Sequence, residues 1–382
     1  MTKFSDLGLS AHTLHTIATL GYAEPTPIQR EAIPHVLAGR DLVGLAQTGT
    51  GKTAAFGLPL AERLAAGHTR PLPKTAKSLI LAPTRELVNQ IAANLKAFTK
   101  GSRLSIVSVV GGASINVQIQ ALMRGADILV ATPGRLIDLT ERKAVSLREV
   151  KFLVLDEADQ MLDLGFIHAL RRIAAMLGTP RQTLLFSATM PKAIADLSRA
   201  YVTDPVEVSV TPSGRTADKV TQSAHILGQR NKQDLLRTLL SERPKALSLV
   251  FARTKHGAEK LMKVLVAHGF SAASIHGNKS QGQRERAIKA FRDGEVRVLV
   301  ATDVAARGID IPGVTHVYNY DLPEVAESYV HRIGRTARAG AEGEAIALVS
   351  KDDLPLMRAI ERLTKLPIAI ASGAENLAQA GA

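Results

Sequence analysis

Short apolar runs, most of them closed by a cluster of polar residues, recur along the whole chain. They cover residues 78–82, 104–110, 127–131, 152–155 and 183–186, and then 246–251, 272–275, 296–301, 315–319 and 344–349. Segments with the apolar spacing of helices separate most of these runs. This alternation predicts an α/β fold in which mostly parallel sheets carry helices on both faces. In such sheets ligands bind at the carboxyl ends of the strands, where the polar clusters fall.

The alternation is interrupted near the middle of the chain. Residues 211–218 are polar and contain a proline and a Ser-Gly pair, which is typical of a linker. We therefore expect one domain over residues 1–210 and a second over residues 219–366. The small, weakly charged residues 367–382 predict a short flexible tail.

A glycine-rich turn, AQTGTGKT, spans residues 46–53. An apolar segment leads into it and an apolar-periodic segment leaves it, so it lies between a predicted strand and a predicted helix, as a phosphate-binding loop requires. Gly49 and Gly51 allow backbone N–H groups to turn toward a phosphate. Lys52 would reach the β- and γ-phosphates, and the Thr53 hydroxyl would hold Mg²⁺. A chance glycine turn is the alternative, but the flanking pattern favours binding of a nucleoside triphosphate.

The segment before this loop carries a candidate base-recognition site. Helical spacing of apolar residues ends at Gly21, and the prolines of residues 25–27 predict an extended elbow. The amide of Gln29 offers a donor and an acceptor that match the N6 and N7 edge of adenine, and Tyr22 could stack on a base. A plain loop without a ligand is the alternative.

Two further clusters carry groups for hydrolysis. Asp156 and Glu157 directly follow a predicted buried strand. Asp156 would hold Mg²⁺ through its water shell, and Glu157 would polarise the attacking water. In the second half, HRIGRTAR places three arginines within residues 331–338. They form either a solvated helix face or a partner for a phosphate in the other domain, in which case hydrolysis begins only when the domains close.

Composition narrows the class of protein. The chain has 382 residues, a net charge of +13, 46% apolar residues and no cysteine. This composition is globular, and it excludes disulfides and thiolate metal sites. No stretch reaches the length of a membrane span and the first residues lack a signal-peptide core, so we expect a cytoplasmic protein. The charge, present in both halves, indicates either a polyanionic partner or a merely basic surface.

Taken together, the motifs resemble those of the DEAD-box RNA helicases of superfamily 2, over roughly residues 4 to 350. In chain order they are GY-x-x-PTPIQ, AQTGTGKT, PTREL, GG, TPGR, the name motif at residues 156–159, SAT, Gln281-x-x-Arg284, ATD-x-AARGID and HRIGRTAR. The segment from His276, HGNKSQGQR, is most similar to the bacterial RhlE-like branch.

The resemblance implies two tandem RecA-like domains with ATP and Mg²⁺ in the cleft and RNA across both. It implies nucleotide binding by Tyr22, Gln29, Thr48, Gly49, Thr50, Gly51, Lys52, Thr53, Gly308 and Asp310. It implies catalytic roles for Lys52, Asp156, Glu157, Ser187, Thr189, His331, Arg335 and Arg338. It implies sequence-tolerant RNA contacts at Arg85, Gly112, Thr132, Arg135, Arg253, Gln281, Arg284 and Thr302.

The chain departs from the family at Ala337, where glycine is usual. If this position requires a positive φ, an L-residue costs about 1 kcal/mol or more and misplaces Arg338. If the position is helical, alanine is harmless, and we favour that alternative. The long basic C-terminal extension of many relatives is also missing from this sequence.

The residues are compatible with three functions. The first is an RNA-stimulated ATPase that unwinds RNA locally. The second is an ATP-gated RNA clamp or remodelling factor with little unwinding, and the third is a DNA translocase on the same scaffold, against which the motif set argues. We expect a monomer, with components of ribosome assembly or RNA degradation as possible partners.

Overall fold

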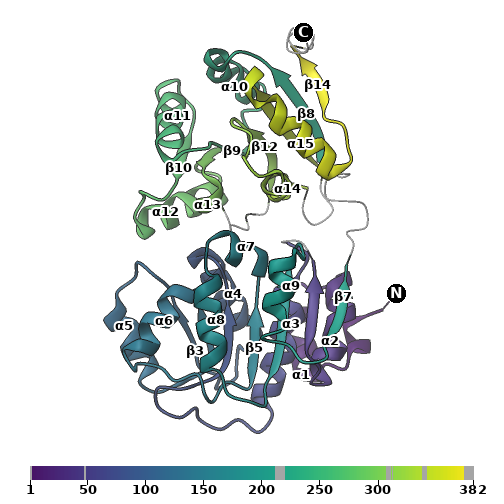
Figure 1. Cartoon of the computed structure of the whole chain (residues 1–382), viewed down its shortest axis with the longest axis vertical. Helices are drawn as coiled ribbons and strands as arrows, with labels where there is room; N and C mark the ends of the chain where they lie inside the picture. The colour runs from purple at the N-terminus through teal and green to yellow at the C-terminus, as the bar shows by residue number, and fades with distance from the viewer. Residues whose placement is uncertain are drawn as a thin grey trace. The chain divides into compact units, whose positions relative to one another are not determined.

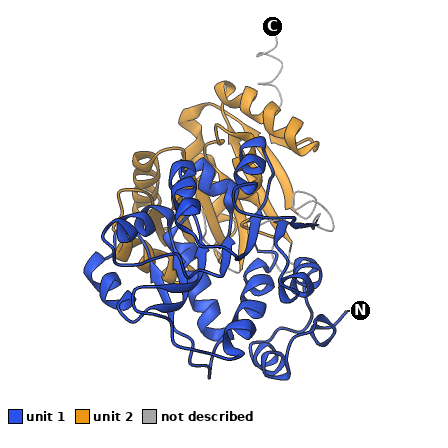
Figure 2. Cartoon of the chain, turned by 60° about the horizontal axis from the view of Figure 1, so that its bottom comes forward, with its two compact units in different colours: residues 1–211 blue, residues 212–382 orange. Residues whose placement is uncertain are grey.

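Each half of the chain is built on a seven-stranded parallel sheet. The computed structural model describes residues 2–46, 49–210, 220–306, 311, 313–337 and 342–373. It divides into two compact units, Met1–Thr211 and Pro212–Ala382 (Figure 2). The division falls within the predicted linker, residues 211–218, which lie outside the described residues.

The sheet of the first unit has the strand order β3-β4-β2-β5-β6-β1-β7. Its strands are β1 (Leu42–Leu45), β2 (Ala76–Leu81), β3 (Ile106–Val109), β4 (Ala126–Ala131), β5 (Phe152–Leu155), β6 (Gln182–Ser187) and β7 (Val206–Ser209). Every pairing among them is parallel. Successive strand residues face opposite sides, so the sheet has an apolar core on each face. This confirms the fold expected from the apolar runs.

Helices cover both faces of this sheet (Figure 1). One core contains residues from α1 (Ala11–Thr19), α2 (Pro27–Leu37), α3 (Lys52–Ala65) and α4 (Arg85–Phe98). The other contains residues from α5 (Ile115–Leu122), α6 (Pro133–Glu141), α7 (Ala158–Asp163), α8 (Ile167–Met176) and α9 (Lys192–Ser198). Gly44 in β1 is needed for packing, because a Cβ there would lie 2.6 Å from the ring of Phe186.

The second unit repeats the plan with the strand order β10-β11-β9-β12-β13-β8-β14. Its strands are β8 (Val220–Ile226), β9 (Leu247–Phe251), β10 (Ala272–Ile275), β11 (Val298–Ala301), β12 (Val314–Asn319), β13 (Gly343–Val349) and β14 (Ala369–Ser372). One face packs against α10 (Lys232–Ser241) and α11 (Lys255–Ala267). The other face packs against α12 (Gln281–Arg292), α13 (Asp303–Ala306), α14 (Ala326–Ile333) and α15 (Leu354–Thr364).

Two local predictions were wrong. Residues 369–372, expected in a flexible tail, form β14, which pairs in parallel with β8. The composition hid this strand because its small residues carry little hydrophobic signal, yet Ile370 packs against the core of the second unit. The extended elbow also ends earlier than expected, since Thr26 is the last extended residue and Pro27 begins α2. Proline suits that first helical position because its missing N–H is not needed there.

Candidate functional site

The phosphate-binding loop joins β1 to α3, as predicted. Gly49 and Gly51 have φ angles of 82° and 91°, which an L-residue adopts only with strain. Lys52 is only 5% exposed. Its Nζ donates a hydrogen bond to the Ala46 carbonyl oxygen at 3.1 Å and lies 3.7 Å from Asp156 Oδ1. The ammonium group is therefore held within the loop, beside the acidic pair.

Gln29 lies in the first turn of α2 and connects that helix to the phosphate loop. Its Oε1 accepts a hydrogen bond from the Thr26 backbone N–H at 2.9 Å, and its Nε2 donates to the Gly51 carbonyl oxygen at 3.0 Å. The side chain is 1% exposed. A Cβ at Gly51 would lie 2.4 Å from Gln29 Nε2, so a side chain there would displace the Gln29 amide. Each end of the amide keeps one further hydrogen-bonding position, since an amide offers two donors and two lone pairs.

Tyr22, expected to stack on a base, is half-buried beside this helix. Its ring meets Phe4 and Phe98 edge-on, with centroids 6.2 and 6.1 Å away. Burial raises the pKa of the Tyr22 hydroxyl. The aromatic contacts therefore fix the ring against the core of the first unit.

Asp156 and Glu157 directly follow β5, which lies two strands away from β1 and its phosphate loop in the sheet. Asp156 is 2% exposed, and burial raises the pKa of its carboxyl to about 6, although Lys52 acts in the opposite direction. Glu157 has a φ of 54° and turns the chain sharply into α7. Within the described part of the chain, Asp156 Oδ1 accepts no hydrogen bond, and Lys52 Nζ is the cation that lies 3.7 Å from it.

These residues fit a Mg²⁺ ion. The buried Asp156 oxygen and the Thr53 hydroxyl, in the first turn of α3, are the hard oxygen donors that Mg²⁺ prefers. Among the described residues there is no group of three or more histidine, cysteine or carboxylate side chains that could hold a metal without help. Mg²⁺ here would depend on water and on substrate phosphates, which is its usual mode of binding.

A link between the acidic pair and the SAT segment was not foreseen. Asp159 Oδ2 accepts hydrogen bonds from the backbone N–H groups of Ala188 and Thr189, both at 3.0 Å, and from Thr189 Oγ1 at 3.1 Å. Ser187 Oγ donates to the Thr189 carbonyl oxygen at 2.7 Å. The turn after β6 is therefore tied to α7, which begins directly after Glu157. The position of Asp159 in the name motif was the available signal.

The RNA-contact candidates of the first unit lie on three neighbouring strand ends. Arg85 follows β2, Gly112 follows β3, and Thr132 and Arg135 follow β4, and these three strands are adjacent in the sheet. A Cβ at Gly112 (φ 73°) would lie 2.0 Å from Arg85 Nη1, so the guanidinium rests on the glycine backbone. Arg135 Nη1 donates to the Ala113 carbonyl oxygen at 3.1 Å. The structure brings these four residues together.

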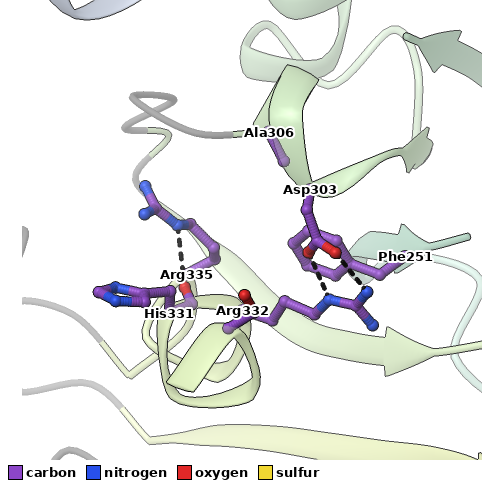
Figure 3. A pocket seen from close by; sticks show the side chains of 7 residues that line it. Phe251, Asp303, Ala306, His331, Arg332 and Arg335 are labelled. Carbon is purple, nitrogen blue, oxygen red and sulfur yellow. Dashed lines mark hydrogen bonds and ion pairs between the residues drawn. The ribbon is translucent and has the colours of Figure 1, made fainter. Parts of the chain in front are cut away.

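In the second unit, Figure 3 shows a pocket lined by residues of β9, α13 and α14. Arg332 points toward Phe251 and Asp303, whereas Arg335 points away from them. Arg335 is buried, and its Nε donates to the His331 carbonyl oxygen at 3.1 Å. The volume of about 20 Å³ suits one water molecule rather than a nucleotide.

The RNA-contact candidates of the second unit also follow neighbouring strands. Thr302 follows β11, Arg253 follows β9, and Gln281 and Arg284 lie on α12, after β10. Arg284 Nη2 donates to the Ala305 carbonyl oxygen at 3.3 Å, which joins α12 to α13.

Beneath Arg253 lies a buried ion cluster that no sequence signal indicated. Arg253 Nη2 donates to Asp353 Oδ1 at 2.9 Å, and Lys232 Nζ donates to Asp353 Oδ2 at 3.0 Å. Lys232 is completely buried. Burial alone would raise the pKa of the Asp353 carboxyl, but hydrogen bonds from Ser350 and Lys232 lower it to about 2.

The preferred interpretation of Ala337 was wrong. α14 ends at Ile333, and Ala337 has a φ of 54°, the left-handed conformation that favours glycine. Directly before this turn, Thr336 Oγ1 donates to the Val314 carbonyl oxygen at 2.6 Å. Four predicted site residues, Thr48, Gly308, Asp310 and Arg338, lie outside the described residues.

Two features of the first unit define the class of protein. A phosphate loop after β1 and an acidic pair after β5, on either side of β6, define a nucleoside triphosphatase built on a parallel sheet. The family described as "DEAD/DEAH box helicase" matches residues 26–197, and "Helicase conserved C-terminal domain" matches residues 231–340. The chain belongs to the DEAD-box ATP-dependent RNA helicases.

Particular relatives agree with this assignment. The chain is 44% identical over 365 residues to the DEAD-box ATP-dependent RNA helicase CshA of Bacillus cereus, covering 96% of this chain and 69% of that protein. It matches S. cerevisiae Dbp5 bound to RNA and ADP BeF3 with a TM-score of 0.85 and 30% identity, over 100% of this chain and 98% of that one. It matches Mss116p bound to ssRNA and AMP-PNP with a TM-score of 0.87 and 29% identity, over 98% of this chain and 81% of that one. The RhlE-like branch stays a prediction.

Proposed function

We propose that this chain is an RNA-stimulated ATPase that couples ATP binding and hydrolysis to RNA binding and local duplex unwinding. The observation that carries the proposal is the buried pair of Lys52 and Asp156, 3.7 Å apart, which joins the phosphate loop to the acidic pair. Dbp5 and Mss116p, whose folds this chain shares, are bound to RNA and to nucleotide in the matching structures. Since the relatives are named as helicases, a clamp without unwinding is not favoured.

In this proposal Lys52 leaves the Ala46 carbonyl oxygen to contact the β- and γ-phosphates. Thr53 and, through its water shell, Asp156 would hold Mg²⁺, which when bound would neutralise phosphate charge. Glu157, held at a sharp turn beside Asp156, positions the attacking water and takes its proton. The raised pKa of Asp156 supports this role, because a buried carboxylate that lacks enough positive charge suits an incoming cation.

The remaining nucleotide contacts follow the motif positions. Gln29 reads the adenine edge with Tyr22 beside it, and Thr48, Gly49, Thr50 and Gly51 surround the phosphates. Gly308 and Asp310 contact the ribose. The charge that develops during hydrolysis is stabilised by Arg335 and Arg338, together with His331. Ser187 and Thr189 pass the state of the acidic pair to the RNA side, which the Asp159 link supports.

RNA is proposed to lie along Arg85, Gly112, Thr132 and Arg135 in the first unit and along Arg253, Gln281, Arg284 and Thr302 in the second. These groups suit phosphates and sugars, so binding should be sequence-tolerant and salt-dependent. No described helix is long and apolar enough to cross a membrane. We further propose a cytoplasmic monomer that serves ribosome assembly or RNA degradation.

The test compares Glu157→Gln with Lys52→Ala. Glu157→Gln keeps the side-chain shape but removes the base, so turnover should fall about 10²-fold or more. ATP-dependent RNA binding should persist in this variant or become tighter. Lys52→Ala should lose affinity for both nucleotide and RNA, and the measurement is RNA dwell time by fluorescence anisotropy with ATP present.

The outcome against the proposal is specific. If Glu157→Gln releases RNA as fast as Lys52→Ala does, hydrolysis does not control RNA release. Stimulation of the ATPase by DNA as strong as that by RNA would instead support a DNA translocase. A strand-displacement assay on a short RNA duplex completes the test, because a clamp would hold RNA without separating it.

A further inference from the structure

Arg332 is buried in the second unit, where its side chain is only 2% exposed. Its guanidinium nevertheless carries a permanent positive charge. Its Nε and Nη2 donate to the two carboxylate oxygens of Asp303 at 2.6 and 2.7 Å. Its Nη1 donates to Asn319 Oδ1 at 3.0 Å and to the Asp321 carbonyl oxygen at 2.5 Å. The guanidinium also lies 4.9 Å from the ring centroid of Phe251. Figure 3 shows the Arg332 side chain pointing toward Phe251 and Asp303.

These partners belong to three neighbouring strands. Asp303 follows β11, Phe251 ends β9, and Asn319 ends β12, and the sheet places β9 between the other two. One side chain of α14 therefore spans three strand ends at the carboxyl edge of the sheet. A bidentate pair fixes direction as well as distance, so this contact determines how α14 sits on the sheet.

Candidate functional groups lie on both sides of the pair. Thr302 immediately precedes Asp303, and its carbonyl oxygen accepts the N–H groups of Ala305 and Ala306 at 3.0 and 2.9 Å. Arg335 follows Arg332 by three residues, and its backbone N–H donates to the Arg332 carbonyl oxygen at 3.0 Å. The ion pair between the partly buried Asp303 and the buried Arg332 therefore connects the segment of Thr302 to that of Arg335.

We propose that Asp303 and Arg332 are positioning residues that align Arg335 when RNA occupies the Thr302 side of the second unit. This inference rests on the proposed function, since it assumes that Arg335 acts on the nucleotide and that Thr302 contacts RNA. Neither Asp303 nor Arg332 touches a reacting group. Their role is to hold α13, α14 and the ends of β11 and β12 in one arrangement, so that RNA contact and the arginine move together.

The test uses Asp303→Asn, which keeps the side-chain size and removes the charge. RNA-stimulated kcat should fall about 10²-fold, the cost of misplacing a catalytic group by about 1 Å. The RNA concentration for half-maximal stimulation should change by less than about threefold, because a loss confined to kcat marks an effect on the transition state. Asp303→Glu, which retains the charge, should recover part of the loss.

A double-mutant comparison separates positioning from general damage. On an Arg335→Ala background, Asp303→Asn should have no further effect on kcat, because the group that it positions is gone. The matched control is Glu344→Gln, which changes a carboxylate paired with Arg243 at 3.2 Å, near the start of β13. This control should leave stimulation unchanged.

Three results decide between the possibilities. If Asp303→Asn keeps normal stimulation, or slows Arg335→Ala by the same factor as it slows the unmutated protein, the positioning role is wrong. If Arg335→Ala itself keeps stimulated turnover, the proposed function of Arg335 fails instead. Thermal unfolding checks integrity, and should Asp303→Asn unfold at the assay temperature, Arg332→Lys replaces it. That variant keeps the charge but loses the fork, so it should lose stimulation to a similar extent.

Discussion

The left-handed conformation of Ala337 makes Ala337→Gly a sharp test of backbone strain. An L-residue in this region costs about 1–2 kcal/mol relative to a right-handed conformation. Two effects oppose the gain from glycine. Glycine loses about 0.5–1 kcal/mol more conformational entropy on folding, and the partly buried methyl group of Ala337 loses its contacts with the core of the second unit.

A control substitution cancels both opposing effects. Ala359 is also partly buried, lies in the middle of α15 and has helical backbone angles. Ala359→Gly removes the same methyl group and adds the same freedom, but releases no strain, so it should cost about 1 kcal/mol. The difference between the two variants isolates the left-handed penalty, and we expect Ala337→Gly to be more stable than Ala359→Gly by about 1–2 kcal/mol.

Calorimetric unfolding measures this difference. For a unit of this size, about 1–2 kcal/mol corresponds to a separation of roughly 2–8 °C in Tm. If Ala337→Gly lowers Tm as much as Ala359→Gly does, Ala337 is not strained in solution, and the turn after α14 differs from that described above. Turnover of Ala337→Gly in the same preparation then shows whether the strain affects catalysis, since residue 338 is a predicted arginine finger.

Two further predictions address recognition and stability. Gln29→Ala should raise the KM for ATP and narrow the preference for ATP over GTP, because an amide matched to a base edge is worth roughly 1–3 kcal/mol. Equal use of ATP and GTP by the unmutated protein would contradict this assignment. The depressed pKa of Asp353, about 2 against an ordinary value of 3.8, stabilises the fold at higher pH, and that contribution should disappear as pH falls through this range. Acid unfolding of Asp353→Asn should lack this component, and an unchanged acid profile would count against the buried cluster with Lys232.

The two sheets could be predicted from the sequence, because parallel strands that are buried on both faces are continuous apolar runs. Each of the ten predicted runs overlaps an observed strand. The strands that this apolar pattern did not predict lie at or near sheet edges and are less apolar than the central strands. Residues 206–209 and 369–372 form edge strands with one neighbouring strand each. Because an edge strand needs less apolar surface, the sequences of these two segments resemble those of loops. Pairing with β1 and β8, which composition cannot reveal, is what makes them strands.

The site was predictable where a residue type is tied to a chemical task. Lys52 and Asp156 lie within 3.7 Å of each other although 104 residues separate them in the chain (156 − 52), and their motifs alone placed them in one site. For residues that act on other protein groups, the motifs marked the positions but not the partners. Asp159 binds backbone N–H groups, and Arg332 binds a carboxylate and a carbonyl. Contacts of this kind depend on which strands become neighbours, and that is decided by tertiary packing.

The buried charges explain why such contacts matter for function. Removing one partner of a buried pair leaves an uncompensated charge and typically costs about 3–5 kcal/mol, whereas a well-packed apolar replacement of the whole pair is often neutral. Stability alone therefore does not require Lys52 with Asp156, or Arg332 with Asp303. Both pairs lie at the carboxyl edge of a parallel sheet, where ligands bind, and both join segments that carry candidate ligand contacts. Lys52 can exchange its protein partners for phosphate, whereas Arg332 has a planar fork already filled by Asp303, Asn319 and Asp321. The first pair is thus suited to change with the nucleotide, and the second to stay fixed while it holds Arg335 in line with the Thr302 side of the second unit.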